Sequence, residues 1–257
     1  MTSVLPVSAL TIRDLFRRRI FVILWLFGGL LVLLSFPLRQ LTIGQWARLI
    51  TDVGFGATDL CATFLAIFLG ATLVAGDLDR RTLYPLLAKP LGRPAFVVGK
   101  FLGLATVLAA LIATMTVGIV AMLLLARQKL ALETGAIPQT AFAMMLHAWL
   151  CGGLALMFSS FTSVTLSAIF GFAVALLGHT LDNLVYFAEK SHSATGKILL
   201  GVTKILPNLS LLDLKTLAAH QKTIPWGDLL ARSGYALAYT AALVALGAAI
   251  FSRRDLK

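Results

Sequence analysis

GDLDRRTLYPLLAKPLGRPAFVVGK, residues Gly76 to Lys100, is the stretch that decides how this 257-residue chain folds. It carries seven charged side chains, and long apolar runs precede and follow it. Isolated charges are costly in the core of a bilayer, so a charged segment between two membrane spans has to lie at a water face. The stretch therefore predicts a polar loop that joins two membrane-spanning helices.

A short helix with one apolar face is predicted inside this loop. Leu83, Leu86 and Leu87 recur at helical spacing, and an element of this kind can dock into a groove on a partner protein. The alternative is an ordinary solvated loop whose basic residues set the orientation of the chain. The leucine spacing alone leaves both interpretations open.

The composition is that of an integral membrane protein. Hydrophobic residues make up 59% of the sequence and charged residues 13%, against roughly 25% charged residues in soluble domains. The net charge of +11 lies at the ends of apolar runs, which indicates lipid headgroups rather than nucleic acid as the partner. Cys61 and Cys151 both fall inside apolar runs, so we expect no disulfide framework.

Six apolar runs predict six transmembrane helices, and the expected fold class is an all-α integral membrane protein. A hydrocarbon core of about 30 Å needs about 20 predominantly apolar residues to cross it. We interpret residues 1–257 as a single transmembrane domain, with spans at about 20–36, 55–75, 101–126, 141–158, 164–181 and 229–251.

The segments between the spans carry their own expectations. Met1–Arg19 predicts a short amphipathic helix along the membrane interface. Arg39–Gly54 and Arg127–Thr140 are expected to be plain connections. The longest connection, Asp182–Asp228, is rich in leucine in its second half. It predicts two short extracytoplasmic helices that lie on the outer face or dip into it.

The placement of lysine and arginine predicts the orientation of the chain. Six spans put both termini on one side. The N-terminal segment, the central loop and the C-terminal tail carry twelve of the 22 basic residues. Five others lie in the long fifth connection, where charge has less influence on topology. The positive-inside rule therefore places both termini and the central loop in the cytoplasm, in a multi-pass protein of the cell (inner) membrane.

We find neither a nucleotide-binding motif nor a catalytic one in the sequence. Gly92–Lys100 is similar to a phosphate-binding loop only in part, because Phe101 stands where Ser or Thr is needed. The four histidines have no carboxylate or nucleophile at a suggestive spacing. The spans carry almost no charge near their middles, which disfavours a proton-coupled carrier. We therefore expect no enzyme activity and no cofactor in this chain, so any ATP is bound by another protein.

One group of soft ligands lies on the fourth predicted span. Met144, His147 and Cys151 share one helical face at i, i+3 and i+7, and sulfur and imidazole ligands suit copper. Three residues on one helix do not close a metal site, and Met and Cys are ordinary apolar fillers. We expect the group to be structural, although the sequence does not settle whether it has a metal role.

Small residues at four-residue spacing mark three candidate contacts between subunits, because such residues let helices approach closely in lipid. Ser167, Gly171 and Ala175 form one set in the fifth predicted span. Gly99 and Gly103 form a second at the start of the third, and Ala241, Ala245 and Ala249 form the last in the sixth.

The central loop resembles that of the ABC-2 type permeases, the type-2 family of ABC exporters. The family pattern is an acidic residue, Gly-Thr or Arg-Thr, leucine, a leucine pair, proline, a basic residue and Gly-Lys before the next span. This chain meets the pattern with Asp77, Arg81, Thr82, Leu83, Leu86, Leu87, Pro90, Arg93, Gly99 and Lys100. Thr11–Phe21 and Leu206–Leu214 also match the family, so the resemblance covers essentially the whole chain.

By this resemblance, the chain is the membrane-spanning permease subunit of an ATP-binding cassette exporter. The loop would be the coupling helix that sits on a separate ABC ATPase subunit, which holds the ATP and Mg. Two permease subunits, as a homodimer or a heterodimer, would form the pathway. Two departures stand out: Pro85 lies inside the expected docking helix, and Arg81 replaces the glycine of many members. Neither the substrate nor the direction of transport follows from the sequence.

Two other classes of function were weighed. A membrane scaffold or anchor would recruit a cytoplasmic partner without transporting anything, and it fits the same hydropathy pattern. An intramembrane enzyme lacks candidate catalytic residues in the sequence. Co-purification of an ATPase would separate the exporter subunit from both alternatives.

Overall fold

The structure, a computed structural model, describes residues 4–34, 46–79, 92–125, 135–190, 201, 203 and 206–253. Regular structure within these residues is helical, which confirms the all-α expectation for this part of the chain. In chain order the elements are α1 (Val4–Phe16), α2 (Arg19–Leu34), α3 (Trp46–Asp79), α5 (Arg93–Leu125), α7 (Ala136–Ser159), α8 (Val164–His179), α9 (Leu181–Lys190), the 3₁₀ turn η2 (Ser210–Leu212), α11 (Lys215–Ala219) and α12 (Trp226–Arg253).

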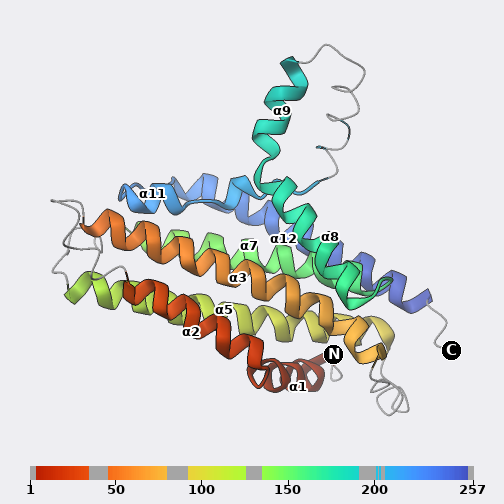
Figure 1. Ribbon diagram of the computed structural model, residues 1–257. Coiled ribbons are helices and arrows are strands. Elements are labelled where there is room, and N and C mark those ends of the chain that lie inside the picture. The colour runs from red at the N-terminus through yellow and green to blue at the C-terminus, as the bar shows by residue number, and fades with distance from the viewer. Residues whose placement is uncertain are drawn as a thin grey trace.

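Four of these helices are long and apolar enough to cross a membrane. They lie in α3, α5, α7 and α12, over Ala47–Asp77, Pro94–Leu125, Ala136–Ser159 and Trp226–Arg253. The second, third, fourth and sixth predicted spans lie almost wholly within these helices. The four helices run side by side as a bundle (Figure 1). The chain is therefore a multi-pass membrane protein.

The fifth predicted span is shorter than expected. Its place is taken by α8, which has 16 residues and ends at His179, while α2 covers the described part of the first predicted span. At 1.5 Å per residue such a helix is about 24 Å long, less than the roughly 30 Å of hydrocarbon. After α8 the chain turns into α9, which points away from the bundle (Figure 1). The six-span topology remains a prediction.

The first and last helices meet the central loop at one end of the bundle. In Figure 1, α1, the end of α3, the start of α5 and the end of α12 lie toward the end where the two termini are marked. The start of α3 and α11 lie toward the opposite end. The N-terminal helix, the two helix ends that flank the central loop and the C-terminal end of α12 therefore lie at the same end of the bundle.

Close packing between α3 and α7 holds the centre of the bundle together. A Cβ atom on Gly70 would lie 2.8 Å from the carbonyl oxygen of Gly152, so the two backbones touch. The Ser159 hydroxyl donates to the carbonyl of Ala71 over 2.7 Å and accepts from the backbone N–H of Ala75 over 2.9 Å. Small residues and a cross-helix hydroxyl thus join the two helices directly.

Two long helices begin earlier than the hydropathy of the sequence indicates. α3 begins at Trp46, so the second half of the predicted connection Arg39–Gly54 is helical. Ala47, Ile50 and Thr51 are buried there at helical spacing. α7 begins at Ala136, inside the predicted connection Arg127–Thr140. In both places the helix continues past the apolar run because one of its faces packs inside the bundle.

The long fifth connection forms short helices, as expected, and it packs into the bundle. η2 and α11 lie in its second half, and Leu209, Leu212 and Leu214 are buried. The backbone N–H of Leu209 donates to the carbonyl of Gly178 over 3.1 Å at the end of α8. The fifth connection therefore supplies a hydrogen-bond donor to the C-terminal end of α8, which is shorter than the hydrocarbon core is thick.

Candidate functional site

The central loop is described only at its two ends. α3 ends at Asp79 and α5 begins at Arg93. The predicted docking helix, with Arg81, Thr82, Leu83, Leu86, Leu87 and Pro90, lies outside the described residues, as does the side chain of Arg93.

Asp77 and Lys100 join the two helices at these loop ends. The Nζ atom of Lys100 lies 2.6 Å from Oδ2 of Asp77, and the two side chains are only 13% and 17% exposed. Lys100 also lies over the ring of Phe96, with Nζ 5.4 Å from the ring centroid. Two residues that the sequence analysis assigned to the coupling loop thus form one ion pair between α3 and α5.

α1 lies against the start of α5, at the two glycines of the third predicted span. A Cβ atom on Gly99 would lie 2.9 Å from the Cβ of Val7, and one on Gly103 would come equally close to α1. The amphipathic N-terminal helix predicted from the sequence is therefore present. It packs on both glycines from within the same chain, and the predicted contact with a second subunit stays a prediction.

Arg18 connects the turn between α1 and α2 to the end of α3. Its Nη1 atom donates to Oγ1 of Thr72 over 2.8 Å, and its Nη2 atom lies 3.0 Å from Oδ2 of Asp14. This contact joins the α1–α2 turn to α3, and the ion pair between Asp77 and Lys100 joins α3 to α5. All these elements are thus connected near the helix ends that flank the central loop.

Ser167, Gly171 and Ala175 also pack within the chain. All three are buried. The Ser167 hydroxyl donates to the carbonyl of Ala155 over 2.7 Å, and a Cβ atom on Gly171 would lie 3.0 Å from Cγ2 of Ile67. This set therefore holds α8 against α7 and α3 within the chain.

A buried polar cluster, which the sequence analysis missed, links α3, α7 and α11. Asp59 of α3 uses both of its carboxylate oxygens. Oδ1 lies 3.0 Å from Nδ1 of His147 on α7, and Oδ2 lies 2.6 Å from Nζ of Lys215 at the start of α11. Asp59 is 7% exposed and His147 is 3% exposed. The spacing of residues in the sequence does not indicate this carboxylate partner of His147, which lies 88 residues away.

Three further side chains surround this cluster. Sγ of Cys151 lies 3.6 Å from Nε2 of His147, and the rings of His147 and His179 have centroids 5.1 Å apart. Oδ2 of Asp213 lies 3.4 Å from the Lys215 ammonium. Burial lowers the pKa of Lys215, but the carboxylates of Asp59 and Asp213 outweigh it and hold the pKa above its ordinary value. Lys215 is therefore a cation at neutral pH.

A cysteine, a histidine and an aspartate in a row resemble the parts of a nucleophilic triad. Cys151 is fully buried, however, and a nucleophile has to reach its substrate. The copper interpretation of Met144, His147 and Cys151 meets a different obstacle. Nδ1 of His147 is already bonded to Oδ1 of Asp59, which leaves Nε2 and Sγ of Cys151, 3.6 Å apart, as a pair on one helix that does not close a metal site by itself. The geometry favours a hydrogen-bonded ionic cluster over either chemistry.

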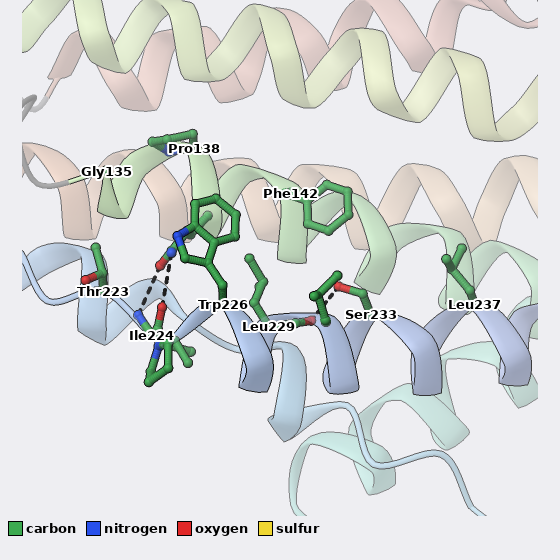
Figure 2. Close-up of a pocket in the computed structure, with 12 residues that line it drawn as sticks. Gly135, Pro138, Phe142, Thr223, Ile224, Trp226, Leu229, Ser233 and Leu237 are labelled. Carbon is green, nitrogen blue, oxygen red and sulfur yellow. Dashed lines mark hydrogen bonds between the residues drawn. The ribbon is translucent and has the colours of Figure 1, made fainter.

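An apolar pocket of about 940 Å³ opens between the start of α7 and the start of α12. Figure 2 shows Trp226 extending from α12 toward Pro138 of α7. At its edge, the Gln139 side chain donates to the carbonyl of Ile224 over 3.2 Å and accepts from its N–H over 3.0 Å. This exchange of hydrogen bonds fixes the far end of the segment that carries α11.

The match to a family of known proteins covers nearly the whole chain. A family model described as "ABC-2 family transporter protein" matches residues 11–256. No curated protein matches the sequence closely. The matched residues include both ends of the central loop, the second half of α1 and the buried cluster.

Proposed function

Because the chain belongs to the ABC-2 family of transporter proteins, we propose that it couples ATP hydrolysis on a separate ATPase subunit to export across the membrane. Family membership makes it a permease component of an ABC transporter. The finer proposal is that the central loop docks on the ATPase, which holds the ATP and Mg, and that a second permease subunit completes the pathway. The docked loop would lie on the cytoplasmic side of the inner membrane.

The ion pair between Asp77 and Lys100 is the observation that best supports this proposal. A loop that transmits force has to be fixed to the helices it moves. The pair joins the last turns of α3 to the first turns of α5, with Nζ and Oδ2 2.6 Å apart. A push on the loop would therefore move both helix ends together instead of bending the loop alone.

The packing beyond the loop ends supports transmission into the bundle. α3 is joined to α7 through Ser159 and through the touching backbones at Gly70 and Gly152. α5 carries α1 at Gly99 and Gly103. Well-packed helices shift as units rather than deforming continuously. Movement of the loop would thus be carried to the far end of the membrane by α3, α5 and α7.

Co-purification with the ATPase tests the proposal. Each buried leucine of a docking face contributes about 1.5–3 kcal/mol of apolar burial, and a charge in an apolar groove adds a desolvation cost. A loss of about 4 kcal/mol weakens an interface roughly a thousandfold. We expect the double variant Leu86→Asp, Leu87→Asp to reach the membrane at normal levels, to lose its ATPase and to show no ATP-dependent transport.

A matched control adds the same two charges away from the leucine spacing. Pro85→Asp with Ala88→Asp should retain most of the ATPase, because neither position stands three or four residues from Leu83, Leu86 or Leu87 on a helix. If the Leu86, Leu87 variant keeps its ATPase as the parent does, the loop is only a connector. If the protein that co-purifies with the parent does not hydrolyse ATP, the chain is a membrane anchor instead.

A further inference from the structure

We propose that a proton and the ammonium group of Lys215 are alternative counter-ions of Asp59, and that His147 is the site that binds this proton. Release of α11 from α3 and α7 would then take up one proton at His147. The inference concerns the chain by itself and does not depend on the ATPase.

Asp59 needs a counter-ion because its carboxylate is enclosed by helices. It is 7% exposed, and its two oxygens have one partner each, Nδ1 of His147 and Nζ of Lys215. A buried charge without a partner is strongly unfavourable. If Lys215 left, a proton on His147 would be the nearest replacement for its positive charge.

His147 can hold either charge state without losing a hydrogen bond. When neutral, it donates from Nδ1 to Oδ1 of Asp59 and accepts at Nε2 from the Cys151 thiol, 3.6 Å away. When protonated, it keeps the first bond and donates from Nε2 to the sulfur, because a thiol is both a weak donor and a weak acceptor. Cys151 thus allows the ring to be protonated in place.

Lys215 is the partner that can leave, because it lies on a much shorter element than Asp59 and His147. α11 has five residues. Near the cluster it is held by the Lys215 ion pair and by a 3.4 Å hydrogen bond from Thr140 to the carbonyl of Leu214. Asp59 and His147 instead lie on α3 and α7, which pack tightly together. Displacement of α11 would separate Lys215 from a pair that stays in contact.

The charges around the cluster determine whether low pH favours or disfavours the displacement of α11. With α11 in place, protonation of His147 would put a second cation on the Asp59 carboxylate. With α11 displaced, that proton is the only counter-ion. Asp213 moves with Lys215 and has a side chain 33% exposed, so its charge is screened. Low pH should therefore favour displacement of α11, and displacement should favour protonation.

Other titratable groups near His147 give the experiment its controls. His179 of α8 lies beside the ring, and Cys151 lies on α7 itself. On α12, the guanidinium of Arg232 donates to the carbonyl of Leu211 over 2.6 Å. The charged residues of α5, Arg93 and Lys100, lie at its start.

Thiol labelling of α11 in the full chain, reconstituted in phosphatidylcholine vesicles, tests the proposal. Ala218 is 2% exposed, so Ala218→Cys should react with a membrane-impermeant maleimide only when α11 is displaced. Thr216→Cys, exposed on the same helix, corrects for the pH dependence of thiol reactivity. The parent, whose two cysteines are buried, supplies the background. Between about pH 8 and about pH 5.5, the Ala218/Thr216 labelling ratio should rise at least about fivefold.

Three variants make the result specific. His147→Gln should abolish the rise. Lys215→Met should give a high ratio at both pH values, and Lys215→Arg should restore the parent behaviour, which keeps the test decisive if the His147 variant does not fold. His179→Gln should leave the rise unchanged. A flat ratio in the parent, a rise that persists in His147→Gln, or a rise that disappears only in His179→Gln would overturn the proposal.

Discussion

Gly103 of α5 faces Thr11 of α1 so closely that a Cβ atom on the glycine would lie 2.6 Å from the Cβ of the threonine and 3.0 Å from the carbonyl oxygen of Ser8. Real Cβ atoms do not come so near. The N-terminal helix can therefore take this position only because position 103 has no side chain. α1 and α5 are therefore complementary in shape at this contact.

Gly103→Ala should displace α1 and destabilise the protein. Overpacking of a close contact typically costs about 1–3 kcal/mol, so we expect a lower melting temperature in detergent. Gly234→Ala on α12 is the matched control, because a Cβ atom there would have no neighbour within 4 Å and alanine favours helix. Equal melting temperatures for Gly103→Ala and the parent would show that α1 is not seated as described.

The ion pair between Asp77 and Lys100 should show coupling in a double-mutant cycle. Asp77→Asn and Lys100→Met each remove one partner of a mostly buried pair, which can cost about 3–5 kcal/mol. The double variant should lose less than the sum, with a coupling of about 0.5–3 kcal/mol. Thermal unfolding of the four proteins measures it. Additive losses would mean that the two residues act independently.

The topology predicted from the basic residues is testable with single cysteines. A cysteine introduced at Ser191, in the long fifth connection, should react with an impermeant thiol reagent added outside intact cells. One introduced at Ala88, in the central loop, should react only after the cells are opened, because the positive-inside rule places this loop in the cytoplasm. Labelling of position 88 from outside would contradict the six-span topology with both termini inside.

We expect Met144, His147 and Cys151 on α7 to have a structural role and not to bind a metal. We expect the combination of His147→Gln and Cys151→Ser to leave the metal content of the purified protein unchanged, as measured by elemental analysis. The reason is that Nδ1 of His147 is bonded to Asp59, and the remaining soft ligands on one helix do not close a metal site. Loss of one bound copper ion per chain in the variant would reverse this expectation.

The long helices follow from the sequence because the bilayer demands unbroken apolar runs. Their starting points do not follow, because burial inside the bundle replaces lipid as the apolar environment. Thr51, for example, is only 1% exposed, and its hydroxyl donates to the carbonyl of Ala47 over 2.7 Å within the helix. A hydropathy scale scores such a residue as polar and so indicates a loop, although its hydroxyl is hydrogen-bonded within the helix.

The buried cluster could not be predicted from spacing. His147 lies 88 residues from Asp59, and Lys215 lies 156 residues from it. Only the fold brings them together. One signal was available in the sequence: Asp59 is an acid inside an apolar run, and an ionisable residue in a membrane span is functional or paired by default. The identity of its partners depended on which helices pack against α3.

α8 has a consequence for the surrounding lipid. With 16 residues it is about 24 Å long, and a typical hydrocarbon core is about 30 Å thick. As the fifth span of the predicted topology, α8 would thin the bilayer beside it, at a fraction of a kcal/mol for each ångström of mismatch. Bilayer thickness would then be a physical variable for this protein, and a membrane thinner than average would fit the α8 side of the bundle with the least distortion.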